Sequence, residues 1–219
     1  MNKKIFIFGS KPNTQIPNEK CDLILSANGG AYYAKKYLEN FPETYHINIV
    51  TDQGFIKIKK LRDIIEKSMP SKIIFRGDRI DLKKHSFILS SHNSVKIDYF
   101  GYFQQFIFQK RFFQMGLLNL ILGEFHYEKT LLNKISYLIK CIKSKIFLGT
   151  STGLFTTLYA LDKYPDSKVF LYGITINGGV QFYNINEKNK YKHKNRYNVD
   201  KYLYDKLKKI FKNEIYFID

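Results

Sequence analysis

Four short segments of the chain place glycine beside small polar side chains, next to an apolar run or at the start of a helical pattern. They are Gly9–Asn13, Asn28–Gly30, Thr51–Gly54 and Gly149–Gly153. Glycine lets a ligand approach backbone N–H groups, and a helix N-terminus favours a phosphate. Each segment alone is also typical of a plain turn or a helix cap. Taken together, the four favour a nucleotide or a nucleotide-sugar as the bound molecule.

Several well-known site motifs are missing from the sequence. It has no GxxxxGK[ST] segment, and no GxGxxG follows the first apolar run. These absences disfavour P-loop kinases and classical dehydrogenases. No Asp-x-Asp pair follows a predicted strand either, which disfavours a metal-dependent sugar transferase. We therefore expect neither a divalent metal nor a resident cofactor.

His193 is the histidine whose sequence context best suits acid–base chemistry. It lies in the basic, tyrosine-rich segment Tyr191–Tyr197. An imidazole can take a proton from a sugar hydroxyl, while neighbouring Tyr and Lys side chains can stabilise a departing phosphate. An exposed loop histidine without a chemical role is the alternative. The other histidines fit packed or surface positions better: His46, His85, His92 and His126.

The elements that must position these residues alternate along the chain. The predicted strands are Lys4–Phe8, Asp22–Ser26, His46–Val50, Lys72–Phe75, Lys145–Leu148, Lys168–Tyr172 and Glu214–Ile218. The predicted helices are Ala31–Glu39, Ile56–Lys67, Thr152–Lys163 and Val199–Phe211. This alternation predicts an α/β fold, with a Rossmann-like, mainly parallel sheet and helices on both faces. The carboxyl ends of parallel strands meet at one edge, so the glycine-containing segments should meet there.

The length of 219 residues indicates a single domain, residues 1–219. Within it, residues 100–142 have a helical period and predict a small helical insertion or lid. Its aromatic stripe favours packing in the core or the lid over contact with a membrane: Phe103, Phe106, Phe112 and Phe113. Residues 174–198 are polar and lack periodicity, which predicts a lid loop over the active site.

The chain is strongly basic, with 36 Lys and Arg against 19 Asp and Glu and a net charge of +17. Such a surface favours anionic partners, either phosphate-bearing substrates or an anionic membrane. A lysine-rich solvated surface, arising from A+T-rich codons, explains the charge equally well, since only five of the basic residues are arginine. Nucleic acid is a disfavoured partner because no recognition motif accompanies the charge.

The sequence predicts a cytoplasmic protein. The first apolar run, Ile5–Phe8, is too short for a signal peptide, and no apolar stretch approaches the ~20 residues that span a bilayer. Cys21 and Cys141 are isolated and suggest neither a disulfide framework nor a metal site. Peripheral contact with the inner face of an anionic membrane is a further expectation, and the sequence leaves open whether the chain forms a homo-oligomer.

The order of the motifs resembles that of the bacterial sialyltransferases of glycosyltransferase family 42, which transfer sialic acid from CMP-sialic acid to lipooligosaccharide. IFIFGSKPNT resembles the first strand and Gly-Asn-Gly-Pro-Ser loop of that family, LILSANGG its second strand, and NIVTDQGF its third. Thr150–Gly179 resembles its Thr-Ser-Gly helix and the strand that follows. The segment containing His193 resembles the one that holds its catalytic histidine. The resemblance covers most of the chain except the middle helices and the end.

The resemblance implies a variant of the GT-A fold and a metal-independent, inverting transfer of sialic acid, or a related acidic sugar, from a CMP donor to a cell-surface glycan. His193 would be the general base, and Tyr183 and Tyr191 would stabilise the leaving phosphate. The resemblance implies nucleotide contacts from Gly9, Ser10, Asn28, Asp52, Ser151, Thr152, Gly153 and Asn177.

Six positions depart from the family pattern. Ser10 and Asp52 stand where the family has asparagine, and Lys11 where it has glycine. Gly149 replaces an arginine, Thr175 an aspartate, and Asn177 a tyrosine. Two alternatives therefore stay open: a transferase for another sugar, such as CMP-Kdo, and a non-catalytic nucleotide-binding relative.

Overall fold

The computed structural model describes residues 3–77, 95–113, 150–174, 181–184, 194–211 and 214–218, together with Leu132 and Ile135. The predicted strand Lys145–Leu148 lies outside the described residues.

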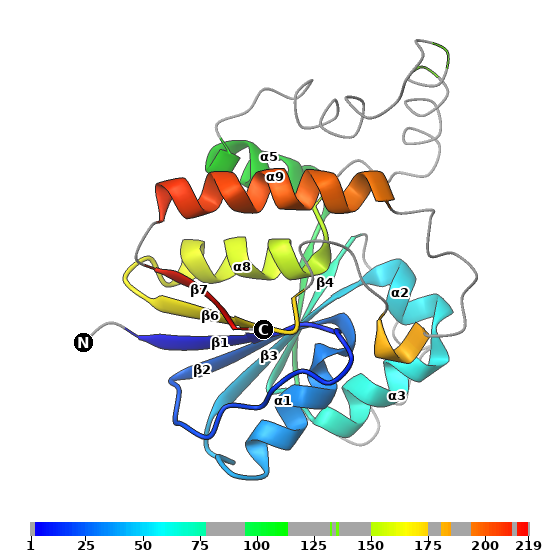
Figure 1. Cartoon of the computed structure of the whole chain (residues 1–219). Helices are drawn as coiled ribbons and strands as arrows, with labels where there is room; N and C mark the ends of the chain where they lie inside the picture. The colour runs from blue at the N-terminus through cyan, green and yellow to red at the C-terminus, as the bar shows by residue number, and fades with distance from the viewer. Residues whose placement is uncertain are drawn as a thin grey trace.

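The described strands form one parallel sheet in the order β5-β4-β3-β2-β1-β6-β7 (Figure 1). Their bounds are β1 Lys4–Phe8, β2 Leu23–Ala27, β3 Tyr45–Thr51, β4 Lys72–Arg76, β5 Lys96–Phe100, β6 Lys168–Tyr172 and β7 Ile215–Ile218. In the centre, Ile7 of β1 is in register with Leu25 of β2 and Leu171 of β6. The predicted α/β, Rossmann-like parallel sheet is therefore confirmed.

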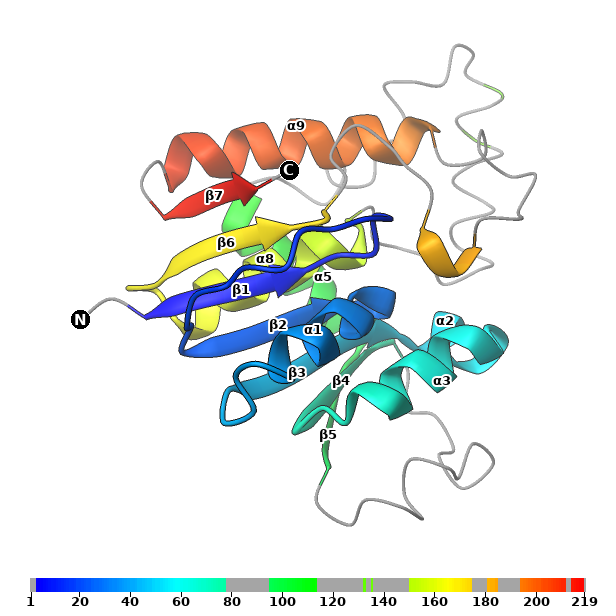
Figure 2. The same ribbon diagram turned by 60° about the horizontal axis from the view of Figure 1, so that its bottom comes forward.

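Helices cover both faces of the sheet, as the sequence predicts (Figures 1 and 2). One face carries α1 Ala31–Leu38, α2 Asp52–Lys57 and α3 Lys59–Ser68. The other carries α5 Tyr102–Phe113, α8 Thr152–Lys163 and α9 Lys194–Ile210. Two 3-10 turns, η1 Asn28–Gly30 and η3 Phe182–Asn184, lie after β2 and β6.

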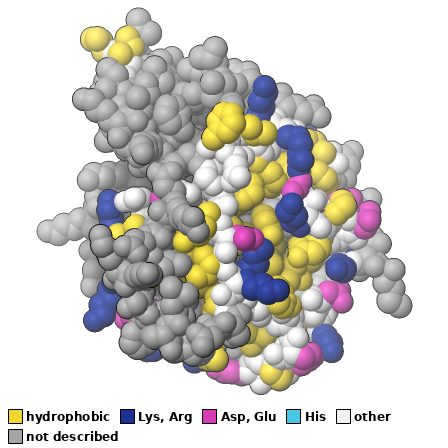
Figure 3. Space-filling model, turned by 180° about the vertical axis from the view of Figure 1, so that it is seen from behind, with side chains coloured by type: hydrophobic (Ala, Val, Ile, Leu, Met, Phe, Trp, Pro, Cys, Tyr) yellow, Lys and Arg dark blue, Asp and Glu magenta, His cyan; other side chains and the backbone are white. Residues whose placement is uncertain are grey.

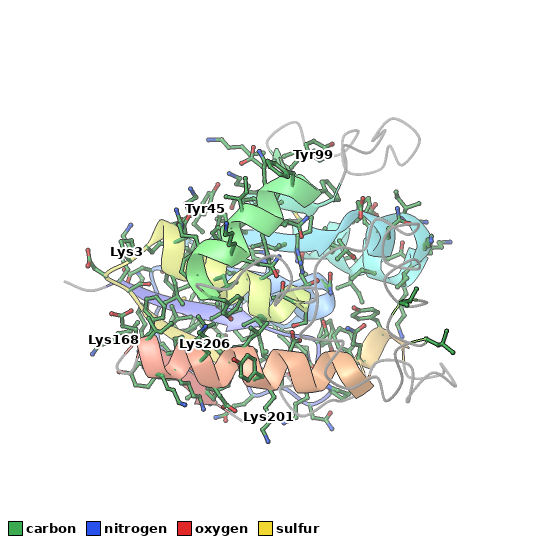
Figure 4. All side chains as sticks on the ribbon, turned by 90° about the horizontal axis from the view of Figure 1, so that it is seen from above. Lys3, Tyr45, Tyr99, Lys168, Lys201 and Lys206 are labelled. Carbon is green, nitrogen blue, oxygen red and sulfur yellow. The ribbon has the colours of Figure 1, made fainter. Side chains whose placement is uncertain are left out.

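Alternating side chains of β1, an inner strand of the sheet, enter two different cores. Ile5 and Ile7 belong to the cluster formed with α5, α8 and α9, whereas Phe6 and Phe8 pack on the side of α1. A central parallel strand is buried on both faces, which is why its sequence is a continuous apolar run. Figure 4 shows α8 between α5 and α9; Lys206, labelled there, donates to the Phe113 carbonyl and joins α9 to α5.

The structure differs from the sequence prediction in several places. Strand β5 was not predicted, because it lies at an edge and its partly exposed side chains interrupt the apolar run. Residues 9–22 connect β1 to the parallel β2 without a helix. Helix α9 begins at Lys194, so the last residues of the predicted loop 174–198 are helical.

The aromatic stripe of α5 divides between core and surface. Phe113 is fully buried and Phe112 packs against the same core, as predicted. Phe103 is 73% exposed, so its predicted packing is wrong. The side chain of Phe106 lies outside the described residues.

The surface carries its charges in a dispersed pattern on the face seen in Figure 3. There the described Lys and Arg side chains are scattered among acidic and apolar side chains and form no single patch. In the described part of the chain, no helix has both the length and the apolar character needed to cross a bilayer.

Candidate functional site

The strand order reverses direction at β1, which lies between β2 and β6 (Figure 2). In open α/β sheets, ligands bind at such a switch point, beyond the carboxyl ends of the strands. Gly9 follows β1 there, and its N–H donates to the Tyr172 carbonyl at 2.7 Å. A Cβ atom at Gly9 would lie 2.2 Å from the Gly173 oxygen, so this close approach of β1 and β6 requires glycine.

Ser10 and Asn28 link the end of β1 to the ends of β2 and β3. The Ser10 hydroxyl donates to the Ala27 carbonyl at 3.2 Å. Asn28 adopts a left-handed backbone with φ of 51°, a conformation that asparagine tolerates better than most residues. Its Oδ1 accepts from the Thr51 N–H at 3.4 Å. The two predicted nucleotide contacts therefore lie on neighbouring loops.

Three buried neutral side chains of β2 and β3 form a chain of polar contacts that ends at the Asn28 carbonyl: His46, Ser26 and Asn48. Asn48 Nδ2 donates to Ser26 Oγ at 2.8 Å and to the Asn28 carbonyl at 3.1 Å. Ser26 Oγ lies 2.8 Å from His46 Nε2. Burial lowers the pKa of His46 to about 3, so the imidazole is neutral at pH 7. We call these three residues the neutral network.

Asp52 begins α2 at the end of β3 and is only 4% exposed. Its Oδ1 accepts from the Gln53 N–H at 2.6 Å, and Thr51 Oγ1 caps the helix by accepting from the Gly54 N–H at 3.2 Å. A Cβ atom at Gly77 would lie 2.1 Å from Asp52 Oδ2. Asp52 thus lies where the ends of β3 and β4 meet.

Arg76, the last residue of β4, reaches the segment that precedes α8. Its Nη2 donates to the Thr150 carbonyl and its Nη1 to Thr152 Oγ1, both at 3.3 Å. Its Nε donates to Gln105 Oε1 of α5 at 3.1 Å. The guanidinium carbon lies 4.3 Å from the centroid of the Phe155 ring, and the residue is 4% exposed.

Asp200 of α9 contacts the same segment and is 1% exposed. Its Oδ1 accepts from the Ser151 N–H at 3.0 Å. Ser151 Oγ in turn caps α8 by accepting from the Leu154 N–H at 3.2 Å. The segment is also tied to α5, because Thr150 Oγ1 donates to Gln109 Oε1 at 2.7 Å. We call Arg76 and Asp200 the charged clamp.

The contacts form a continuous line along the carboxyl edge. It runs from β6 through β1, β2, β3 and β4 to the N-terminus of α8, and it closes where Gly153 packs beside Ile174. Seven of the predicted nucleotide-binding residues lie along this line: Gly9, Ser10, Asn28, Asp52, Ser151, Thr152 and Gly153. Their contacts with a nucleotide stay predictions.

The predicted catalytic residues are only partly described. Tyr183 lies in η3 and is 6% exposed. Its ring packs on Gly29, where a Cβ atom would lie 2.3 Å from a ring carbon. The Phe182 N–H donates to the Ser10 carbonyl at 3.1 Å and so joins η3 to the β1 loop. Tyr191, His193 and Asn177 lie outside the described residues, and α9 begins directly after His193.

The residues that support this edge were not predicted from the sequence. They include both members of the charged clamp, Gln105 and Gln109, and His46 was expected only as a packed residue. An arginine at the end of an apolar run was an available signal for Arg76. No signal separates Asp200 from the other charged residues of its helix.

Among the residues that the structure describes, no three His, Cys, Asp or Glu side chains are grouped so that they could hold a metal. Comparisons of the chain with protein-family models, with curated proteins and with solved structures found no match.

Proposed function

We propose that this protein is a glycosyltransferase that moves sialic acid, or a related acidic sugar, from a CMP donor to a glycan acceptor without a metal ion. One observation carries the proposal: Gly9, Ser10, Asn28 and the Ser151–Gly153 segment meet at the switch point of the sheet. This is where open α/β sheets bind nucleotides. The choice of CMP and of the acidic sugar rests on the resemblance to family 42.

The parts of the donor are assigned by their chemistry. The N-terminus of α8, with Ser151, Thr152 and Gly153, suits the phosphate because helix N-termini favour anions. Ser10 and Asn28 offer a hydroxyl and an amide to the nucleoside. The carboxylate of Asp52 would repel a phosphate, so we assign it to a donor group of the ribose or the cytosine.

The transfer would be a single displacement. His193 takes the proton of the acceptor hydroxyl while the hydroxyl oxygen attacks the anomeric carbon of the sugar. The bond between that carbon and the phosphate oxygen breaks, and CMP leaves with the bonding electron pair. The hydroxyls of Tyr183 and Tyr191 donate to the departing phosphate. Attack opposite the leaving group inverts the configuration at the anomeric carbon.

Contacts of α9 support the assignment of His193. The helix begins at Lys194, next to His193, and Asp200 on the same helix bonds to the Ser151 N–H. The helix that follows His193 in the chain is thereby joined to the segment that we assign to the donor phosphate.

The test is hydrolysis and transfer of CMP-sialic acid and CMP-Kdo in EDTA by the native chain and by His193→Ala. We expect activity in EDTA that falls at least about 100-fold in His193→Ala, in line with the usual worth of general base catalysis. His92→Ala is the matched control and should keep full activity, because its sequence context is that of a surface residue. CMP binding without turnover of either donor would instead favour a non-catalytic nucleotide-binding protein. A strong preference for CMP-Kdo would change the sugar but keep the reaction.

A further inference from the structure

We infer that Arg76 and Asp200 are positioning residues, which hold the Thr150–Thr152 segment from two separate elements and thereby set its affinity for the donor phosphate. Arg76 comes from β4 and Asp200 from α9. Between them they bond to three consecutive residues, since Arg76 donates to Thr150 and Thr152 and Asp200 accepts from Ser151. The phosphate part of this inference rests on the proposed function. The positioning part rests on the hydrogen bonds alone.

The geometry of Arg76 suits positioning. Three different nitrogens of its side chain donate to three acceptors, which belong to α5, to the Thr150 backbone and to the first residue of α8. The Phe155 ring lies against the guanidinium and restricts its movement. Because a lysine ammonium is a single point charge, it cannot reproduce a planar fork with several donors.

Asp200 holds Ser151, which lies between Thr150 and Thr152. Its carboxylate accepts from the Ser151 N–H, and a charged acceptor makes a stronger bond than a neutral one. A negative charge is also favourable beside a helix N-terminus. One turn later on α9, the Tyr204 hydroxyl lies 3.2 Å from Thr157 Oγ1 of α8. Two contacts therefore keep α9 in register with α8.

Together these bonds restrain the backbone of the segment before any ligand arrives. A site that is already ordered loses less conformational freedom on binding and binds more tightly. Loss of either charged side chain should loosen Thr150–Thr152 while leaving the loops after β1 and β2 in place. When Arg76 is the residue replaced, the affinity for the phosphate should fall and the affinity for the nucleoside should not.

The first part of the experiment needs no ligand. Amide hydrogen exchange is measured at residues 150–155 in the native chain, in Arg76→Lys, in Asp200→Ala and in Asp200→Asn. We expect exchange about tenfold faster in Arg76→Lys and Asp200→Ala. Asp200→Asn keeps an acceptor for the Ser151 N–H and should restore part of the protection. Arg111→Lys and Asp205→Asn are matched controls on the exposed sides of α5 and α9 and should exchange like the native chain. Unchanged exchange in all clamp variants would overturn the inference.

The second part compares the affinities for CMP and cytidine by calorimetry. We expect Arg76→Lys, which keeps the positive charge, to weaken CMP binding at least about tenfold and cytidine binding less than about twofold. Asp200→Ala also removes a negative charge that repels the phosphate, so Arg76→Lys alone is used in this part. An equal loss of affinity for CMP and for cytidine would indicate that the whole site is disturbed and would overturn the phosphate role. If the native chain does not bind CMP, the proposed function and the phosphate role both fail, and hydrogen exchange still decides the positioning role. If Arg76→Lys does not fold, Gln105→Leu removes one acceptor of Arg76 and takes its place in both parts.

Discussion

The neutral network and the charged clamp support the same edge of the sheet by different means. The neutral network joins side chains of the adjacent, directly paired strands β2 and β3. The charged clamp joins elements that are distant in sequence, because Arg76 bonds to residues 74 and 76 positions away and Asp200 to one 49 positions away. Backbone pairing already aligns β2 and β3, so neutral side chains are sufficient there. No backbone ladder aligns α8 with β4 or α9, and strong charged hydrogen bonds replace it.

The loop after β2 also packs directly against the backbone at the end of β1. A substitution that disturbs this contact should have the largest effect on stability. A Cβ atom at Gly30 would lie 2.0 Å from the Phe8 carbonyl oxygen. Gly30→Ala should lower the free energy of unfolding by about 3 kcal/mol or more, since backbone must shift. Urea denaturation of the native chain and of the variant measures this difference in the free energy of unfolding. The control is Gly101→Ala, where the nearest atom is 3.8 Å from the added carbon. Equal stability of the two variants would contradict the contact.

Removal of Arg76 should have the second largest effect on the free energy of unfolding. Arg76→Met leaves buried acceptors without a charged donor and should lower the free energy of unfolding by about 3 kcal/mol. Ser26→Ala, in the neutral network, should cost only about 1 kcal/mol because its hydrogen bonds are between neutral groups. Chemical denaturation of the two variants measures the contrast. A larger loss of stability for Ser26→Ala than for Arg76→Met would mean that the neutral network stabilises this edge more than the charged clamp does.

Acid should weaken the neutral network through His46. Its pKa is about 3 in the folded chain and near 6.5 when unfolded, so the unfolded chain binds more protons between these values. The stability contributed by the neutral imidazole is complete above pH 6.5 and is lost as the pH falls towards 3. The expected slope is up to about 1.4 kcal/mol per pH unit. Unfolding measured between pH 7 and 4 should show a shallower slope in His46→Gln. The same slope in both proteins would mean that His46 titrates normally.

The smallest effects are expected at two helix caps, one beside the neutral network and one in the segment that the charged clamp holds. Thr51 caps α2 and Ser151 caps α8, with cap distances of 3.2 Å in both. Thr51→Ala and Ser151→Ala should each cost about 1 kcal/mol of stability. Only Ser151→Ala should also weaken CMP binding, because Ser151 is assigned to the donor phosphate. Parallel calorimetric titrations of the two variants test this, and equal loss of CMP affinity would remove the distinction between the caps.

Strands and helices with a strong local pattern were predictable from the sequence. β1 and β6 have the predicted bounds because buried central strands are continuous apolar runs. Helix α8 also has its predicted bounds, since Ser151 caps its start. β5 escaped prediction because an edge strand exposes alternate side chains. The convergence of Gly9, Asn28 and Ser151 at one edge was also predictable, because carboxyl ends of parallel strands point the same way.

The sequence alone determined the α/β alternation and the residue types that end each strand, because these patterns depend on neighbours only a few positions away. The tertiary structure decided which strands pair and where their order reverses. It also decided that Arg76 and Asp200, from two separate elements, bond to one segment, Thr150–Thr152. A buried charge is tolerated only where distant groups supply its hydrogen bonds, and those groups come together only when the chain has folded.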